Sequence, residues 1–389
     1  MISAPIADPA RRGTCPTLHA PMLTGDGLLA RVRVLGRVLS LSQFMEIARL
    51  AERHGNGLVE VTARGNLQVR GLTPRSAPQF AEAVAALVAI ESGLVVDVSP
   101  LAGLDPSEAM DPRGLAERIR VAAEPLADRL GPKVSVVVDG NGQVSLADIK
   151  ADIRLTAQTP QTWLMTLGGA KPQAVDEAAA FSTTMAVLGA LAAIGPDARA
   201  TDLFPAPVTK PGKHTAPVAW PGEITLRTGH CGAFALPFGQ IEADSLVGLA
   251  TAMAAEGLDC LRLAPDHVLL VDGMSAALLQ QADDLGFVTR ADDPRRRISA
   301  CSGSQGCASG LIAARQIALR LAEQGVTEQH LHVSGCSKGC AHPGPARVTL
   351  VGRTDGIGLV IDGRAGDTPQ QLLDEAALLA GAVPFQDGR

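Results

Sequence analysis

Four of the chain's seven cysteines stand in two close pairs near the C-terminus. Cys301 and Cys307 form a C-x5-C pattern, and Cys336 and Cys340 form a C-x3-C pattern. Four converging thiolates can hold an iron–sulfur cluster or a structural zinc ion. Zinc sites more often use C-x2-C pairs, which neither pattern provides. The spacing therefore favours an iron–sulfur cluster, with zinc, disulfides and chance placement as the alternatives.

Local sequence around these cysteines suits a bound anionic group. Glycine has no Cβ, so backbone N–H groups beside it can approach a bound sulfur atom closely. A predicted amphipathic helix over residues 308–325 would begin next to Cys307 and point the positive end of its dipole at the thiolates. The glycines beside the pairs are Gly303, Gly306, Gly335 and Gly339.

The elements that must position these residues are repeated along the chain. Residues 59–71 align without a gap with residues 261–273, and in both stretches apolar residues alternate on either side of a polar turn. This pattern predicts two β-hairpins. Each hairpin has a predicted strand and helix before it and a helix after it, which gives a β-α-β-β-α unit close to ferredoxin-like topology. The predicted flanking elements are strands 28–35 and 232–238, and helices 41–54, 77–91, 244–256 and 275–285.

At two positions the first hairpin carries a cation where the second does not. Thr62, Arg64, Gln68 and Arg70 alternate along it, so we expect all four side chains to project from one face. Arginine captures carboxylates by bidentate hydrogen bonds. In the second hairpin, Asp266, Leu270 and Asp272 occupy the positions of Arg64, Gln68 and Arg70. The asymmetry predicts an anion site on the first hairpin, and an ordinary solvated strand face is the alternative.

Three histidines are candidate ligands of a further metal ion. His19 follows Cys15 in a turn-rich segment, His230 precedes Cys231, and His342 follows the last cysteine pair. Imidazole suits iron as a ligand. For each of them a structural or surface role is the simpler interpretation.

Composition bounds the class of protein. A chain of 389 residues with 46% hydrophobic residues is expected to form two or more domains. A net charge of −6 and only 3% aromatic residues argue against nucleic acid as a partner. The N-terminal segment has no apolar core typical of a signal peptide, and the longest apolar stretch, residues 185–194, is about half the length of a membrane helix. We therefore expect a cytoplasmic protein with reduced cysteines and no membrane partner.

With these residues in view, the chain resembles the sirohaem-type nitrite and sulfite reductase superfamily and, within it, the precorrin-3B synthase family. The phrases that carry the resemblance are CPTLHAPMLTGDGLLARV, TARGNLQVRGL, SPLAGLDP and LHVSGCSKGCAHPGPARVTLVG. The resemblance implies an α+β fold with duplicated ferredoxin-like half-domains and two α/β reductase-type domains in pseudo-twofold arrangement. The expected order is a half-domain at 20–95, an α/β domain at 96–203, a proline-rich linker at 204–222, a half-domain at 223–295, and the cysteine-bearing α/β domain at 296–389.

The resemblance also implies roles for individual residues. Cys301, Cys307, Cys336 and Cys340 become ligands of a [4Fe–4S] cluster. Arg64, together with Gln68 and Arg70 of its hairpin, and Lys133 would bind carboxylates of a tetrapyrrole. The chain departs from the reductases at Ser135, where they carry a second lysine, and at residues 94–98, which lack an expected arginine. These departures disfavour reduction of a small oxyanion.

The activity implied by the resemblance is oxygen-dependent hydroxylation of precorrin-3A, with lactone formation, in cobalamin biosynthesis. It requires O2, a tetrapyrrole substrate and an electron donor, either an NADH- or NADPH-linked reductase or a ferredoxin. It also implies a second iron centre, a mononuclear non-haem iron, for which His19, His230 and His342 are the candidate ligands. Two alternatives remain: a small sirohaem-dependent nitrite or sulfite reductase, and an iron–sulfur module without catalytic activity.

Overall fold

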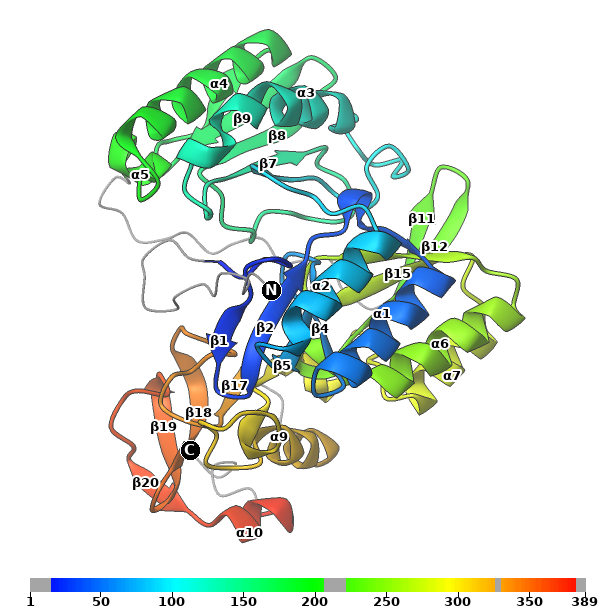
Figure 1. The fold of residues 1–389 in the computed structure, drawn as a ribbon, viewed down its shortest axis with the longest axis vertical. Helices are drawn as coiled ribbons and strands as arrows, with labels where there is room; N and C mark the ends of the chain where they lie inside the picture. The colour runs from blue at the N-terminus through cyan, green and yellow to red at the C-terminus, as the bar shows by residue number, and fades with distance from the viewer. Residues whose placement is uncertain (1–14, 206–221, 326–329, 383–389) are drawn as a thin grey trace.

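The computed structural model describes residues 15–205, 222–325 and 330–382 (Figure 1). Most of the expected proline-rich linker lies outside these ranges. The described chain forms four five-stranded sheets. Two of them lie at the centre of the molecule, one α/β domain lies above them in Figure 1, and the cysteine-bearing domain lies below. The expected α+β class with repeated units is confirmed.

The two central sheets are antiparallel and have the same strand order. Each half of the chain contributes the outermost strand of the other half's sheet, since β3 pairs with β14 and β13 pairs with β4. This exchange ties the two halves together through backbone hydrogen bonds. The first sheet has the order β1 (Met22–Thr24), β2 (Gly27–Val32), β5 (Leu67–Leu72), β4 (Leu58–Val61), β13 (Gln240–Glu242). The second has the order β11 (Gly222–Leu226), β12 (Gly229–Ala235), β15 (Val268–Asp272), β14 (Cys260–Ala264), β3 (Val38–Ser40).

Strand register confirms the internal repeat. In the first hairpin Glu60 lies opposite Gln68, and in the second Arg262 lies opposite Leu270. Both pairs occupy the same places in the gapless sequence alignment. A register slip of one residue would reverse the faces of every side chain, so this agreement shows that the two hairpins are equivalent.

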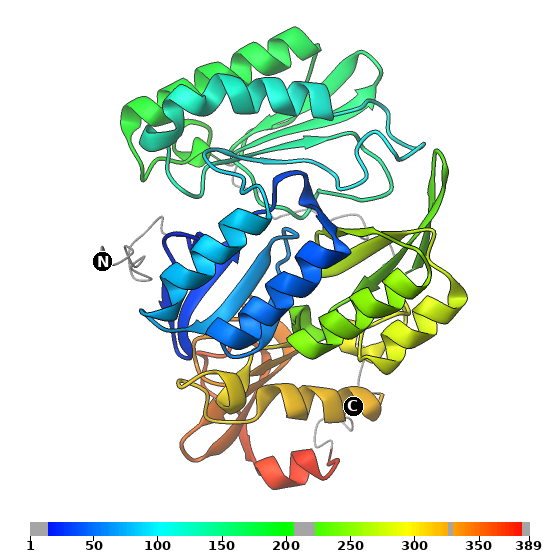
Figure 2. The ribbon, with the colours of Figure 1, turned by 45° about the vertical axis from the view of Figure 1, so that its right-hand side comes forward.

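Helices cover one face of the central sheets. They are α1 (Leu41–His54) and α2 (Ser76–Leu87) in the first half, and α6 (Ala243–Ala255) and α7 (Ala276–Asp284) in the second. Helix α1 begins where Ser40 and Gln43 form a capping box, which satisfies backbone N–H groups of the first turn. It packs against α6 (Figure 2). Phe44 and Ile47 of α1 belong to the same buried core as Leu246 and Leu249 of α6.

The two outer sheets also share one topology, with two parallel pairings followed by two antiparallel ones. The first contains β6 (Val95–Asp97), β7 (Ser135–Asp139), β8 (Ile153–Thr159), β9 (Thr162–Leu167) and β10 (Gln173–Val175). The second contains β16 (Ile298–Ala300), β17 (Leu331–Ser334), β18 (Ala346–Arg353), β19 (Gly356–Gly363) and β20 (Gln371–Leu373). The outer helices are α3 (Arg113–Ala123), α4 (Glu177–Ile194), α5 (Ala200–Leu203), α8 (Gly303–Gly306), α9 (Ala314–Glu323) and α10 (Glu375–Leu379), and the 3-10 turns are η1 (Leu35–Arg37), η2 (Glu124–Arg129), η3 (Pro237–Gly239) and η4 (Pro294–Arg297).

The helix predicted directly after Cys307 begins later than expected. Residues 307–313 form a loop, and α9 starts at Ala314. Gly310 lies so close to the backbone of Gly303 that a Cβ on it would approach Gly303 C to 2.4 Å. Leu311, expected on the buried helix face, is 48% exposed. The predicted contact between a long helix's N-terminus and the thiolates is therefore wrong, because a folded-back loop separates them.

By length and composition alone, α4 qualifies as a candidate membrane span, and it is the one such helix in the described residues. Leu188 and Leu191 on it are fully buried in the core of the first outer domain. A core helix of a folded domain meets the same criteria.

Candidate functional site

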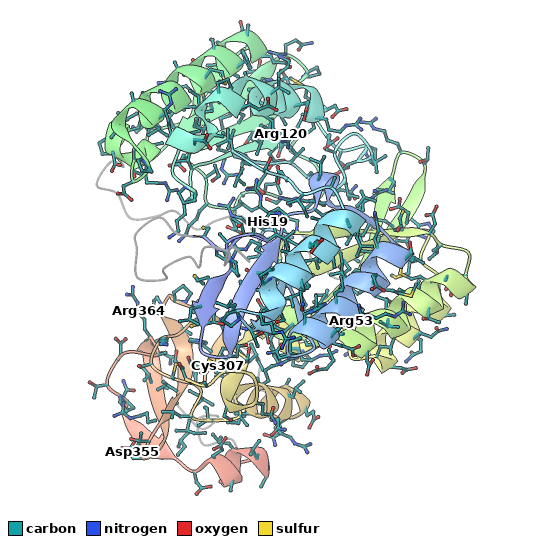
Figure 3. The ribbon with its side chains drawn as sticks, in the orientation of Figure 1. His19, Arg53, Arg120, Cys307, Asp355 and Arg364 are labelled. Atoms are coloured by element: carbon teal, nitrogen blue, oxygen red, sulfur yellow. The ribbon has the colours of Figure 1, made fainter. Side chains whose placement is uncertain are left out.

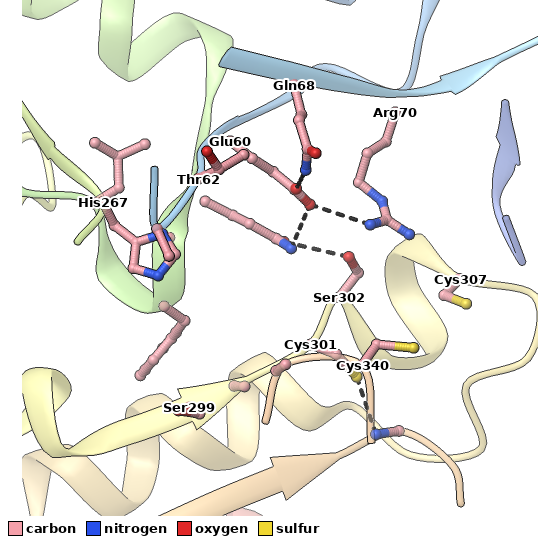
Figure 4. Close-up of a pocket in the computed structure, with 18 of the residues that line it drawn as sticks. Glu60, Thr62, Gln68, Arg70, His267, Ser299, Cys301, Ser302, Cys307 and Cys340 are labelled. Carbon is pink, nitrogen blue, oxygen red and sulfur yellow. Dashed lines mark hydrogen bonds and ion pairs between the residues drawn. The ribbon is translucent and has the colours of Figure 1, made fainter. Parts of the chain in front are cut away.

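A cavity of about 1130 Å³ opens where the first central sheet, the second half and the cysteine-bearing domain meet. All four clustered cysteines line it, together with Gln68 and Arg70 from the first hairpin. Figure 4 shows three of these cysteines, Cys301, Cys307 and Cys340, below the two hairpin residues. Residues almost 300 positions apart are thus brought to one space by the fold. Its volume slightly exceeds the range of ordinary small-molecule pockets, which are roughly 300–1000 Å³.

Two glycines leave space beside the cysteine sulfurs. A Cβ on Gly25, in the turn between β1 and β2, would lie 2.3 Å from Cys307 Sγ. A Cβ on Gly335 would lie 3.3 Å from Cys301 Sγ, and the Gly335 N–H donates to that sulfur at 3.1 Å. These contacts leave room for sulfur and a backbone donor but for no side chain, as a cluster cradle requires.

The thiols are close enough to influence one another. Burial raises the pKa of the Cys340 thiol, and the neighbouring Cys301 and Cys336 thiolates raise it further, while Arg70 acts in the opposite direction. Among the described residues, no three His, Cys, Asp or Glu side chains are arranged to hold one metal ion. A [4Fe–4S] cubane binds one thiolate at each of its four irons, so its ligands stand further apart than the ligands of a single metal ion. The donor chemistry and the glycine cradle fit such a cluster.

A buried polar chain crosses the cavity wall above the cysteines (Figure 4). Its centre is the Glu60 carboxylate, which is 8% exposed. Glu60 accepts hydrogen bonds from the Gln68 amide, from Arg70 Nη1 at 3.2 Å, and from Gln240 Nε2 at 2.7 Å. Gln240 in turn accepts from Ser302 Oγ at 3.3 Å, next to Cys301. The chain connects the first hairpin with the cysteine loop and fixes how the two elements meet.

The cations on the cavity wall differ in how far their charge is neutralised. Arg70 is held by Asp26 in a bidentate pair at 2.8 and 2.9 Å and also contacts Glu60. Arg31, in β2, contacts only a neutral amide within the described residues, donating to Gln68 Oε1 at 2.8 and 2.6 Å. Burial lowers the pKa of Arg31. A half-buried guanidinium whose hydrogen bonds go to a neutral amide is ready to receive an anion.

Sequence reasoning missed Arg31. The usable signal was its register, since Arg31 lies directly opposite Gln68 across β2 and β5 and so shares that residue's face. No local property of the sequence separates it from Arg33, two residues further along.

Two predicted substrate residues lie elsewhere. Thr62, Gln68 and Arg70 line the cavity as their alternation indicates, but Arg64 does not. The hairpin turn begins after β4 ends at Val61, so Arg64 falls outside the strand alternation. It pairs with Asp97, which Arg37 also contacts. Lys133 is exposed and does not line the cavity either. Substrate binding by either residue stays a prediction.

The three candidate histidines occupy separate places. His19 is exposed near the upper end of the first half-domain in Figure 3, far from Cys307 at its lower end. His230 is exposed at the start of β12. His342, in contrast, lies beside two histidines that sequence reasoning did not consider. Its ring centroid is 4.5 Å from that of His330 and 5.7 Å from that of His332.

Comparison with known proteins defines the class first. The family model described as nitrite/sulfite reductase ferredoxin-like half domain matches residues 20–87. The solved structure of the Mycobacterium tuberculosis NirA protein superposes with a TM-score of 0.64 at 20% identity, covering 91% of this chain and 79% of that one. The first half of the chain therefore carries a ferredoxin-like half domain of the nitrite/sulfite reductase type, and the chain shares the fold of NirA.

Sequence relatives narrow the class further. A precorrin-3B synthase from Sinorhizobium sp. is 40% identical over 94% of this chain and 86% of its own length. A ferredoxin–nitrite reductase from Synechococcus elongatus is 30% identical, but over only 38% of this chain and 30% of the relative. Both relatives are enzymes by name. The chain belongs to the precorrin-3B synthase family.

Proposed function

We propose that this chain is an oxygen-dependent monooxygenase that converts precorrin-3A to precorrin-3B in cobalamin biosynthesis. The observation that carries the proposal is the cavity, which is lined by four cysteines and by Arg31 and has a volume of about 1130 Å³. That space suits a tetrapyrrole better than a small oxyanion. Membership of the precorrin-3B synthase family supports the same reaction.

Cys301, Cys307, Cys336 and Cys340 are proposed to hold a [4Fe–4S] cluster. When bound, the cluster would pass single electrons from a donor, either an NADH- or NADPH-linked reductase or a ferredoxin. The chain's own part is to orient the sulfurs, as the Gly335 N–H does for Cys301. A second iron centre is proposed for the chemistry of O2.

The substrate's acetate and propionate groups are proposed to meet the cations of the cavity wall. Arg31 is the first candidate, because its half-buried guanidinium hydrogen-bonds a neutral amide. Arg70 is less available, because Asp26 and Glu60 already hold it. Lys338 stands near the cysteines, where its Nζ donates to Ser309 Oγ at 3.3 Å. Charge-assisted hydrogen bonds from such groups would orient a polycarboxylate over the cysteines.

A second candidate function is a small sirohaem-dependent nitrite or sulfite reductase, supported by the partial match to a ferredoxin–nitrite reductase. Reduction of a small oxyanion needs cations around it as charge develops. Ser135, which stands where the reductases carry a lysine, is 1% exposed within β7. A buried strand position offers no cation to a ligand, and this disfavours the reductase.

One experiment separates the two functions. Anaerobically purified protein with a reduced donor would receive either the tetrapyrrole with labelled O2, or sulfite and nitrite without it. We expect a product heavier by one labelled oxygen atom and no oxyanion turnover. Rapid reduction of sulfite or nitrite, with a sirohaem that survives gel filtration, would assign the chain to the reductases instead.

A further inference from the structure

Three histidines meet on the sheet that carries the cysteines. His330 immediately precedes β17, and His332 lies within it, two residues further on. Residues two apart on a strand project from the same face. His332 stands in register with Ser299 on β16 and Thr349 on β18, which places it in the middle of that sheet. His342 approaches the same face from the loop after Cys340.

His332 is the unexplained member of this group. Its side chain is 0% exposed, and neither ring nitrogen has a hydrogen-bond partner among the described residues. A neutral imidazole carries one donor and one acceptor, and buried polar atoms of this kind are almost always satisfied. Two orphaned nitrogens on one buried ring indicate that a ligand belongs there.

The ring separations match those of imidazoles that share a metal ion. A first-row metal binds imidazole nitrogen at about 2.1 Å, and the ring centre lies about 1.1 Å beyond, so ring centres around one ion stand about 5 Å apart. The observed separations of 4.5 Å and 5.7 Å lie on either side of this value. Two of the three distances are thus already those of a ligating set.

His330 and His342 each have a second ring nitrogen that can bind a metal ion. His330 Nε2 contacts Ser299 Oγ at 3.0 Å, and His342 Nε2 contacts Pro345 O at 3.3 Å. In the part of the chain that the structure describes, these bonds use one nitrogen of each ring and leave Nδ1. The three donors do not yet converge on one point. Convergence requires the His342 ring to turn, and this residue lies in a loop without regular secondary structure.

We propose that His330, His332 and His342 bind one divalent transition-metal ion at the edge of the cavity. Imidazole is a favoured ligand of iron, cobalt, nickel, copper and zinc in their divalent states. Of the three histidines, His330 lines the cavity together with Ser299, so the bound ion would lie beside the cavity. Its identification as the second iron centre rests on the proposed function, whereas the binding of a metal ion does not.

Cobalt(II) is the probe that tests the site, because it is distinct from the iron of the cluster. Full-length protein carrying its cluster would be dialysed against cobalt(II), and bound metal and acid-labile sulfide would be measured in each sample. X-ray absorption spectroscopy at the cobalt K-edge would distinguish nitrogen from sulfur ligands. We expect one cobalt ion per chain with nitrogen ligands. Replacing His330→Gln or His342→Gln should weaken binding at least tenfold and leave sulfide content unchanged.

His230→Gln is the matched control, because that histidine is exposed and lies outside the group. His342→Gln is the decisive variant, since His332→Gln alters a buried position and could disturb folding. Equal cobalt binding by wild type and His342→Gln, or sulfur ligands at the cobalt edge, would overturn the proposal. If histidine-dependent binding appears but precorrin-3A is not converted, the metal site stands and the proposed function fails.

Discussion

Arg70 donates to Glu60 across the first hairpin, with Nη1 3.2 Å from Oε1. The equivalent residues of the second hairpin, Arg262 and Asp272, form an ion pair with the two charges exchanged. The repeated scaffold thus keeps an ion pair in both halves and reverses its polarity. The first copy borders the cysteine-lined cavity, and its arginine faces the anionic thiolates.

Loss of Arg70 should therefore affect the stability of the fold. Arg70→Ala leaves Asp26 and Glu60 in a largely buried position without their cation, and breaking a buried pair costs about 3–5 kcal/mol. We expect the midpoint of urea unfolding to fall with the slope unchanged. Arg262→Ala breaks a pair whose Asp272 side chain is 43% exposed and should cost less. Equal losses in the two variants would contradict this ranking.

Substrate binding should depend on Arg31 more than on Arg64. Loss of one charge-assisted contact costs roughly 1.5–3 kcal/mol, so Arg31→Ala should weaken tetrapyrrole binding about ten- to a hundredfold. Arg64→Ala removes a contact to Asp97 outside the cavity, and affinity should change by less than about threefold. Fluorescence titration of both variants measures the difference. A larger loss for Arg64→Ala would restore the prediction made from the sequence.

Removal of a cysteine ligand should abolish the cluster. Wild-type protein should contain about four irons and four sulfides per chain. Cys301→Ser and Cys336→Ser should lose both, together with the brown absorbance. Cys260→Ser, outside the cavity, should retain them. Stoichiometric zinc without labile sulfide in anaerobically prepared protein would contradict the assignment.

Gly25 offers a steric test of the same site. In Gly25→Ala the new methyl group would lie 2.3 Å from Cys307 Sγ, so either the sulfur or the β1–β2 turn must move. We expect cluster content, measured as labile sulfide, to fall sharply. Gly189→Ala in α4 meets nothing within 4 Å and should stabilise the protein by about 0.5–1 kcal/mol with full cluster content. Unchanged labile sulfide in Gly25→Ala would show that the β1–β2 turn moves to accommodate the methyl group without loss of the cluster.

Glu108 predicts a pH dependence in the first outer domain. Burial, with smaller contributions from Asp105 and Asp111, raises the pKa of this carboxyl to about 7, although a hydrogen bond from the Gly103 N–H acts in the opposite direction. The folded state then holds a proton that the unfolded state releases near its usual pKa of 4.5. Stability should therefore decrease as the pH rises from about 4.5 to about 7. Glu108→Gln should flatten that part of the thermal-melting profile, and an unchanged slope would show that another group titrates.

The sequence alone determined the local elements and the repeat. The capping residues and apolar spacing predicted a helix over residues 41–54, which is α1 as observed. The alternation in the two hairpins predicted their register, because one-sided burial leaves a strand a single favourable register. The two cysteine motifs, Cys301 with Cys307 and Cys336 with Cys340, could be recognised from the sequence because the members of each are close together in the chain.

The tertiary structure decided which of these residues meet. Arg31 and Arg64 are both arginines of the first half-domain. The pairing of β2 with β5 places Arg31 at the cavity, whereas the turn at residues 62–66 places Arg64 beside Asp97. The exchange of β3 and β13 between the halves and the meeting of His330 and His332 with His342 are likewise absent from local patterns. Local periodicity reports which face a side chain takes, whereas its partners are set by contacts between segments distant in the chain.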